Sequence, residues 1–192
     1  ALQFIKQEYP DCQIDWVVEE GFKGILENNP DINIIHTVNL KKVKQQKSLK
    51  LLFKEFKKIR QFGRYDLVID AQGLIKSAIV AKFIQSKKIS GFDKNSIRES
   101  LASALYQHKT FIAYDANTID RNVKVICNPL GLEISSDAII NKQPFLFSQR
   151  EILLPSKPYA LFVIGSTWGS RNYPKEKFAQ VAQALQINCL VV

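Results

Sequence analysis

The sequence predicts an α/β fold with parallel sheets, arranged in two domains of the Rossmann type. Short apolar stretches that suit strands alternate with amphipathic stretches that suit helices along the 192 residues, a pattern typical of parallel α/β layers. Residues 135–157 interrupt this alternation with polar residues and two prolines, as is usual where a chain crosses between domains. The alternation begins afresh at Tyr159. We therefore expect a first domain over residues 1–150 and the start of a second over 151–192.

The elements of the first domain follow in order from local patterns. A helix at the start should stop at Pro10, because proline cannot continue a helix. Apolar runs bounded by polar residues predict strands, and apolar residues at helical spacing predict helices. The expected strands are 13–18, 32–38, 66–70 and 88–91. The expected helices are 1–9, 48–62, 74–85, 97–106 and 118–130, with a turn and short helix over 19–26.

The second domain should open with a buried strand over residues 159–164. A loop of small residues follows at 165–172, and Pro174 suits the first turn of the next helix. Residues 189–192 would form another strand. The chain contains no methionine and stops inside this last apolar stretch, so we expect both ends to be cuts and both domains to be incomplete.

Composition excludes several classes of protein. Hydrophobic residues make up 46% of the chain, which is enough for a core and argues against global disorder. No apolar run approaches the ~20 residues that span a bilayer. Cys12, Cys127 and Cys189 show no CxxC spacing, and His36 and His108 lie far apart, so neither a zinc site nor a disulfide framework is predicted.

The net charge is +9, and much of it falls within residues 41–60. This stretch carries nine lysines and arginines and a single acidic residue, Glu55. Such a surface attracts nucleic acid, anionic lipid or an anionic substrate. The apolar residues from Leu49 to Ile59 follow helical spacing, so lysines between them face water by default. Residues Lys41–Lys47 lack that spacing and predict a basic loop.

The segment Tyr65–Ala78 predicts a buried strand, a tight turn and a helix. Gly73 permits a turn that most side chains would hinder. The helix that begins near Leu74 would aim free backbone N–H groups and Lys76 at an anion above the carboxyl end of the strand. A plain strand–turn–helix with Lys76 in solvent is an equally good interpretation of this spacing.

The loop Gly165–Arg171 predicts a second anion site. Ser166 and Thr167 supply hydroxyl groups, and Arg171 supplies a planar cation that can grip a phosphate with two hydrogen bonds. With a helix beginning close behind, this is a plausible diphosphate site. The fingerprints of P-loop and dinucleotide-binding proteins are absent, and a polar surface turn is the alternative.

Three separated segments resemble the lipopolysaccharide heptosyltransferases, type I most closely, with type II as the nearest competitor. They are Asp15–Phe22, Tyr65–Ala78 and Arg98–Ser103. The resemblance implies a GT-B architecture, two Rossmann-like domains around a cleft. It also implies metal-free, inverting transfer of L-glycero-D-manno-heptose from ADP-heptose to Kdo-lipid A. The implied location is the cytoplasm of a Gram-negative bacterium, peripheral to the inner membrane.

The resemblance also assigns residues. The acceptor would be bound by Gln72, Gly73, Lys76 and Arg98. The donor ADP-heptose would be bound by Ser166, Thr167 and Arg171, the last standing where a lysine is typical of the family. No metal and no further cofactor are implied. The catalytic base is expected upstream of Ala1, so no catalytic residue is assigned and the fragment alone should be inactive.

Two functions from other classes remain as alternatives. One is a nucleic-acid-binding module built around Lys41–Arg60, which lacks a stacking platform or a recognisable reading motif; no nucleic acid partner is therefore expected. The other is a protein that binds the membrane surface without catalysis. Salt-sensitive binding to nucleic acid would favour the first, and vesicle binding without affinity for ADP-heptose would favour the second.

Overall fold

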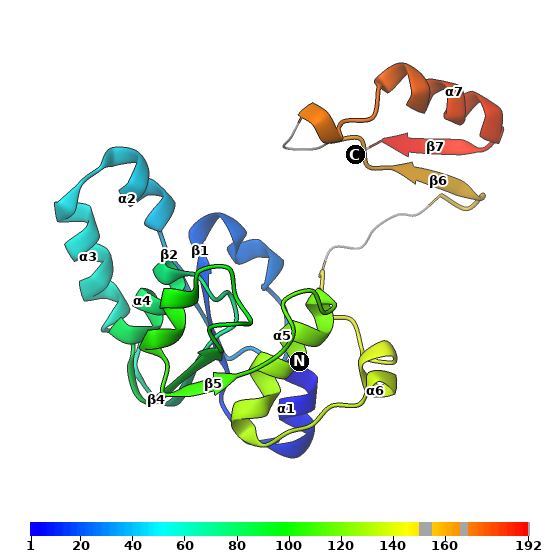
Figure 1. The fold of residues 1–192 in the computed structure, drawn as a ribbon. Helices are drawn as coiled ribbons and strands as arrows, with labels where there is room; N and C mark the ends of the chain where they lie inside the picture. Colours follow the sequence, from blue (N-terminus) through cyan, green and yellow to red (C-terminus); the bar gives the residue numbers. More distant parts are fainter. Residues whose placement is uncertain (150–154, 166–168, 192) are drawn as a thin grey trace. The chain divides into compact units, whose positions relative to one another are not determined.

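The computed structural model describes residues 1–149, 155–165 and 169–191 (Figure 1). The chain divides into two compact units, Ala1–Gln149 and Arg150–Val192, and each is described by itself.

The strands of unit 1 form two parallel ladders. In one, β1 (Asp15–Glu19) pairs with β2 (Ile34–Val38). In the other, β3 (Arg64–Asp70), β4 (Gln85–Phe92) and β5 (His108–Thr110) pair in that order. Parallel neighbours need a crossover connection, which helices supply here. The predicted α/β class with parallel sheets is confirmed.

The helices of unit 1 begin where the sequence offers caps. The Ser48 hydroxyl accepts a hydrogen bond from the N–H of Leu51, and the Asn117 side chain accepts one from the N–H of Ile119. Such caps satisfy N–H groups that a helix leaves without partners. The α-helices are α1 (Leu2–Glu8), α2 (Leu40–Gln46), α3 (Leu49–Ile59), α4 (Ile75–Phe83), α5 (Thr118–Cys127) and α6 (Ser136–Ile140). The 3₁₀ helices are η1 (Glu20–Ile25), η2 (Ser100–Leu105) and η3 (Asn128–Leu130).

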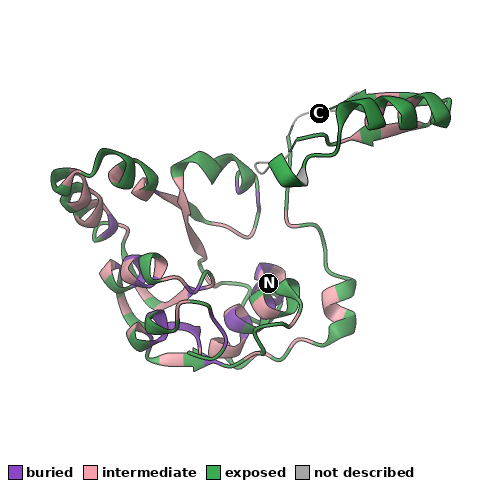
Figure 2. Ribbon diagram, turned by 45° about the horizontal axis from the view of Figure 1, so that its top comes forward, coloured by how far each residue is buried: buried purple, intermediate pink, exposed green. Residues whose placement is uncertain are grey.

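The buried residues of unit 1 gather between the sheets and the helices (Figure 2). One cluster joins β4, α4 and α5 through Ile89, Ala78 and Val125. A second joins β2, α3 and α4, with Ile59 fully buried at its centre beside Val38. The edge of the sheet that carries the candidate site therefore rests on a packed core, which fixes the backbone there.

Three sequence predictions need correction. In the basic segment Lys41–Lys47, predicted as a loop, the residues up to Gln46 are helical in α2, and Lys47 ends the helix in a left-handed conformation. The N–H of Lys41 donates to Oε1 of Glu19 at 2.8 Å, so an acidic side chain from the end of β1 satisfies the start of this helix. That contact is long-range and leaves no local signal. The predicted helix 97–106 is reduced to η2, and β5 and α6 lie where no element was predicted.

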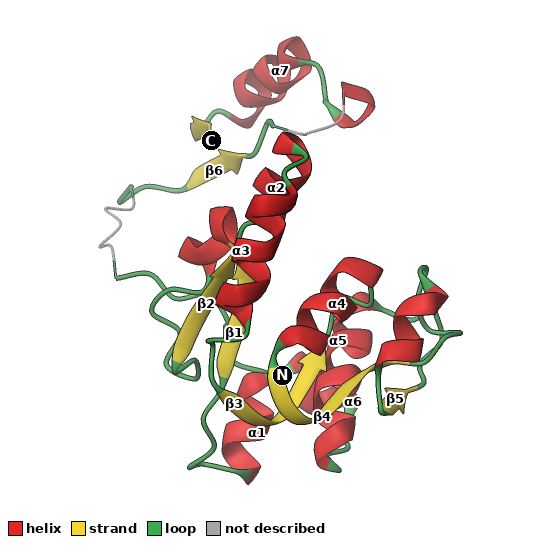
Figure 3. Cartoon of the chain, turned by 90° about the vertical axis from the view of Figure 1, so that its left-hand side faces the viewer, coloured by secondary structure: helices red, strands yellow, loops and turns green. Residues whose placement is uncertain are grey.

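Strands β1–β2 and β3–β4–β5 form separate ladders among the described residues of unit 1 (Figure 3). Side chains connect the two ladders. The Tyr65 hydroxyl on β3 donates to Oδ2 of Asp15 on β1 at 2.7 Å. Nε2 of His36 on β2 lies 2.9 Å from that hydroxyl and 3.1 Å from the same carboxylate oxygen. Burial, followed by the hydrogen bond to Asp15, raises the pKa of Tyr65. Among the described residues, β1 pairs only with β2 and β3 only with β4.

The described residues of unit 2 form one parallel strand pair and one α-helix. Strands β6 (Tyr159–Phe162) and β7 (Asn188–Val191) pair in parallel, and α7 (Lys175–Leu185) connects them. The Phe178 ring of α7 lies 5.5 Å from the Phe162 ring, centroid to centroid. None of the residues described in this unit is buried, so the helix covers its two strands only partly.

Candidate functional site

The turn after β3 is built around the carboxylate of Asp70, the last residue of that strand and only 6% exposed. Its Oδ1 accepts hydrogen bonds from the N–H groups of Gln72 at 2.9 Å and Gly73 at 3.2 Å. Its Oδ2 accepts from the hydroxyl groups of Ser77 and Tyr106, both at 2.7 Å. Four donors thus compensate a buried charge that would otherwise cost free energy.

Tyr106 is the donor to this carboxylate that lies farthest away along the chain. It follows η2 and is buried, with its ring against the backbone of β4. A Cβ added at Gly91 would lie 2.4 Å from the ring, so glycine is required there for the ring to fit. Burial, then the charge of Asp70 and the hydrogen bond to it, raises the pKa of Tyr106. The hydroxyl therefore stays protonated and keeps donating to Asp70.

Gly73 gives the turn its shape. Its φ is +67°, and an added Cβ would lie 2.5 Å from Cγ2 of Ile97 and 3.1 Å from the Phe92 ring. Both the backbone conformation and the lack of space favour glycine. This confirms the sequence prediction of a turn that depends on Gly73.

The start of α4 is already capped by the chain itself. The N–H of Ile75 donates to Oε2 of Glu99 at 2.7 Å, and the N–H of Leu74 donates to the Ser77 hydroxyl at 3.1 Å. The prediction that the first N–H groups of this helix are free to bind an anion is wrong for these residues, because their donors are occupied. The exposed side chains of Lys76 and Arg98 are cationic groups at this edge.

The four residues predicted to bind the acceptor come together at the carboxyl end of β3. Gln72 lies on the turn and Lys76 in the first turn of α4, both with exposed side chains, and Gly73 lies between them, buried. Arg98 is also exposed, and both of its chain neighbours touch the turn: Ile97 packs at Gly73 and Glu99 bonds Ile75. In the described residues, the charged groups of Lys76 and Arg98 form no ion pair, which leaves both available to a ligand.

The predicted donor site lies largely outside the described residues. Ser166 and Thr167 are not among them, and Arg171 is described only as the last residue of the 3₁₀ helix η4 (Gly169–Arg171). The described ranges hold no group of three or more His, Cys, Asp or Glu that could bind a metal. None of the described helices is long and apolar enough to cross a membrane.

Sequence reasoning missed the residues that hold the site in shape. An aspartate at a strand end with glycine three positions later is a local signal of a turn in which the carboxylate accepts backbone N–H groups, so part of the role of Asp70 could have been found. Tyr106 lies 36 residues away from Asp70 along the chain, and no local pattern links the two. Glu99 lies 24 residues from Ile75 along the chain, and its contact with the start of α4 likewise depends on the folded chain.

The fold and this edge define an α/β protein with exposed cations at the carboxyl end of a parallel strand, the place where open α/β sheets bind ligands. The family description "Glycosyltransferase family 9 (heptosyltransferase)" matches residues 52–192. The chain belongs to this glycosyltransferase family, as the three sequence segments predicted.

Relatives cover nearly all of the chain. Lipopolysaccharide heptosyltransferase 1 of Campylobacter coli is 35% identical over 96% of this chain and 55% of that protein. The structure of Escherichia coli heptosyltransferase WaaC with ADP superposes with a TM-score of 0.77, at 25% identity over 99% of this chain and 61% of that one. The structure of the same enzyme with ADP-2-deoxy-2-fluoro heptose superposes with a TM-score of 0.79, over 99% of this chain and 62% of that one. The chain thus spans about half the length of the curated relatives.

Proposed function

We propose that this chain forms part of an inverting glycosyltransferase that moves L-glycero-D-manno-heptose from ADP-heptose to Kdo-lipid A. Family membership and the similarity to lipopolysaccharide heptosyltransferase 1 support the reaction. The ADP and the ADP-heptose analogue in the WaaC structures support the donor. In this chain the observation that carries the proposal is that Lys76 and Arg98 are both exposed beside the turn whose backbone N–H groups donate hydrogen bonds to Asp70.

The acceptor side follows from charge. Kdo and the lipid A headgroup carry carboxylates and phosphates, which exposed cations attract and orient. Gln72 can add hydrogen bonds to sugar hydroxyl groups, and the buried Gly73 lets the turn pass close to the core. Asp70 has its four hydrogen bonds within the protein, so we give it a structural role and assign no catalytic base.

The donor side is assigned to the loop with Ser166, Thr167 and Arg171. Negative charge grows on the diphosphate of ADP as the glycosidic bond breaks. Hydrogen-bond donors that are fixed in advance stabilise that charge in the transition state. In this proposal residues 1–150 belong to the acceptor-binding domain of a GT-B enzyme and residues 151–192 begin its nucleotide-sugar domain. The enzyme needs no metal and works at the cytoplasmic face of the inner membrane.

The test uses the full-length product of the gene that encodes this chain. With ADP-heptose and Kdo-lipid A, mass spectrometry should detect the addition of one heptose and the release of ADP. Transfer only to an already heptosylated acceptor would replace this assignment with the type II reaction. Failure to bind ADP-heptose, with both acceptors unmodified, would overturn the proposed function.

Charge reversal of one lysine tests the acceptor site. Lys76→Glu should raise the KM for the acceptor about tenfold or more, through loss of an attraction and gain of a repulsion of about 1 kcal/mol each, while ADP affinity is unchanged. Lys82→Glu is the matched control, because Lys82 is also exposed on α4 and the net charge changes equally. Arg171→Ala should instead weaken ADP binding more than it changes the KM for the acceptor. Equal acceptor KM values for the two lysine variants would contradict the assignment of Lys76.

A further inference from the structure

The helix pair α2–α3 carries a dense and uncompensated positive charge. Eight of the nine lysines and arginines in residues 41–60 are exposed. The ninth, Lys58, is half-buried and donates to the Thr37 hydroxyl at 3.3 Å. The single carboxylate, Glu55, accepts a hydrogen bond from the N–H of Asn39 at 3.1 Å. It is therefore directed toward the start of α2, which follows Asn39. In the described residues no ion pair involves this stretch.

Two large apolar side chains lie on the same helix in water. Leu49 is 71% exposed and Phe53 is 73% exposed, and their spacing of four residues puts them on one face of α3. The helix is anchored by a different face, where Ile59 is fully buried and the Phe56 ring stacks on Phe83 with centroids 4.1 Å apart. The fold does not need Leu49 and Phe53, since the anchoring face already attaches α3 to the core.

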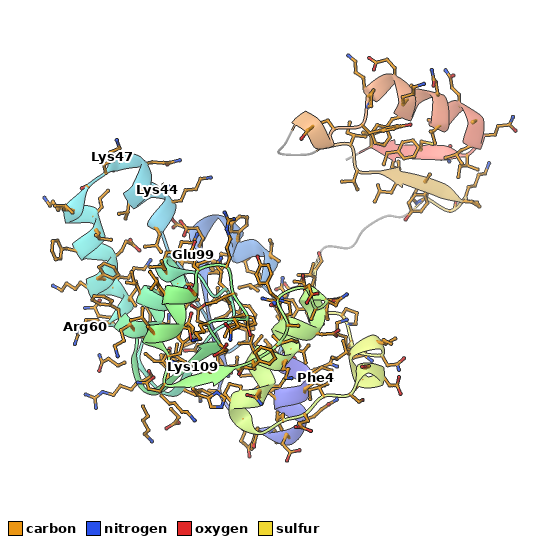
Figure 4. All side chains as sticks on the ribbon, in the orientation of Figure 1. Phe4, Lys44, Lys47, Arg60, Glu99 and Lys109 are labelled. Carbon is orange, nitrogen blue, oxygen red and sulfur yellow. The ribbon has the colours of Figure 1, made fainter. Side chains whose placement is uncertain are left out.

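Cations surround this apolar pair on both sides. Lys57 continues the row four residues after Phe53, and Arg60 lies at the far end of α3 (Figure 4). At the other end, Lys44 and Lys47 lie around the junction of α2 with α3 (Figure 4). The surface is therefore an apolar centre within a basic rim, and we name it the α2–α3 patch. Its residues are Lys44, Lys47, Leu49, Lys50, Phe53, Lys54, Lys57 and Arg60.

We propose that the α2–α3 patch docks on an anionic lipid bilayer, with Leu49 and Phe53 entering the boundary between headgroups and acyl chains. Basic residues with interspersed Phe and Leu on one helix are the signature of a helix that lies in the membrane interface. Each lysine near an anionic leaflet attracts it, and the apolar pair adds buried area. Nucleic acid would satisfy the lysines but offer no apolar environment to Leu49. The proposal rests on the proposed function, whose acceptor is a lipid-linked sugar.

The experiment measures binding of the full-length protein to vesicles by sedimentation. Vesicles of equal parts phosphatidylcholine and phosphatidylglycerol should bind it, and vesicles of phosphatidylcholine alone should bind it much more weakly. The double variant Leu49→Ser, Phe53→Ser should lower the partition coefficient about tenfold or more. The double variant Lys50→Gln, Lys54→Gln should lower the partition coefficient about fivefold for each lysine replaced. Ile140→Ser with Leu146→Ser is the control, because both residues are exposed and lie outside the patch.

Three results of the binding experiments would overturn the docking proposal. The first is unchanged vesicle binding by both patch variants, with circular dichroism showing that they are folded. The second is binding to duplex DNA, but not to anionic vesicles, that the lysine variant loses. The third is a dimer in solution that the Leu49→Ser, Phe53→Ser variant disrupts, with no vesicle binding.

Transfer assays separate this proposal from the proposed function. The patch variants should retain transfer to a detergent-solubilised acceptor and lose most transfer to the acceptor embedded in vesicles. If the unmodified protein transfers no heptose in either format, the proposed function fails, while the vesicle-binding result still decides the docking proposal. Equal losses with solubilised and embedded acceptor would place the patch in the active site and overturn docking as its role.

Discussion

At the scale of single residues, Asp70 determines how the candidate site is held. A buried carboxylate is costly unless donors surround it, and its four donors come from the turn, from α4 and from Tyr106. Three of these lie within seven residues of Asp70 and could be expected from a strand–turn–helix pattern. The fourth, Tyr106, comes from another part of the chain and could not.

Removing the Tyr106 hydroxyl should weaken this arrangement. Tyr106→Phe keeps the ring that packs on Gly91 but leaves Asp70 with one donor fewer in a buried setting. The free energy of unfolding should fall by about 1–3 kcal/mol, as measured by urea denaturation. Tyr114→Phe is the control, since Tyr114 is exposed and its ring lies beside Arg121 whether or not it carries a hydroxyl. Equal stability of the two variants would show that Asp70 gains nothing from Tyr106.

At the scale of elements, the turn between β3 and α4 combines two separate requirements for glycine. Gly73 has a positive φ and also has no room for a Cβ, whereas Gly131 has a positive φ of +75° with open space around it. Alanine at either position bears the strain of the left-handed backbone, about 1 kcal/mol. Only alanine at Gly73 also displaces Ile97, which directly precedes Arg98 in the chain.

This difference can be measured by comparing two variants. Gly73→Ala should destabilise unit 1 by about 1–3 kcal/mol more than Gly131→Ala, because overpacking adds to backbone strain. In the full-length protein it should also raise the KM for the acceptor more than the KM for ADP-heptose, since the turn and Arg98 shift together. Thermal unfolding and initial rates give both quantities. If the two variants match in stability, the crowding at Gly73 has no energetic weight.

The sequence predicts elements well where the signal is local. Strand β3 lies where an apolar run between polar residues predicts it, and helix α3 lies where apolar residues follow helical spacing, although Leu49 and Phe53 of that pattern are exposed. Helix α2 was missed because its lysine-rich sequence buries little and its first N–H groups depend on Glu19. Strand β5 has only three residues and exists because β4 offers it an edge, which is information that a short segment does not contain.

At the scale of the whole chain, the two units differ in how much they bury. All the fully buried side chains among the described residues belong to unit 1. A segment that buries little cannot offset the conformational entropy lost on folding. The family and the α/β class were predictable from the sequence, whereas the contrast in burial between the units depends on which contacts the chain forms.

The units should therefore behave differently when expressed separately. Residues 1–149 should unfold cooperatively on heating, with near-ultraviolet circular dichroism from ordered aromatic side chains. Residues 150–192 alone should show no cooperative transition, since the Phe162–Phe178 contact is one of few that α7 makes with its strands. A sharp thermal transition in the isolated 150–192 segment would contradict this prediction.

The connection between β1 and β3 through side chains alone has a consequence for the behaviour of the chain in solution. In the part of the chain described here, one edge of each strand has N–H and C=O groups without a partner strand. Such edges are templates for pairing with other chains. Concentrated preparations of these residues should therefore tend to associate edge to edge.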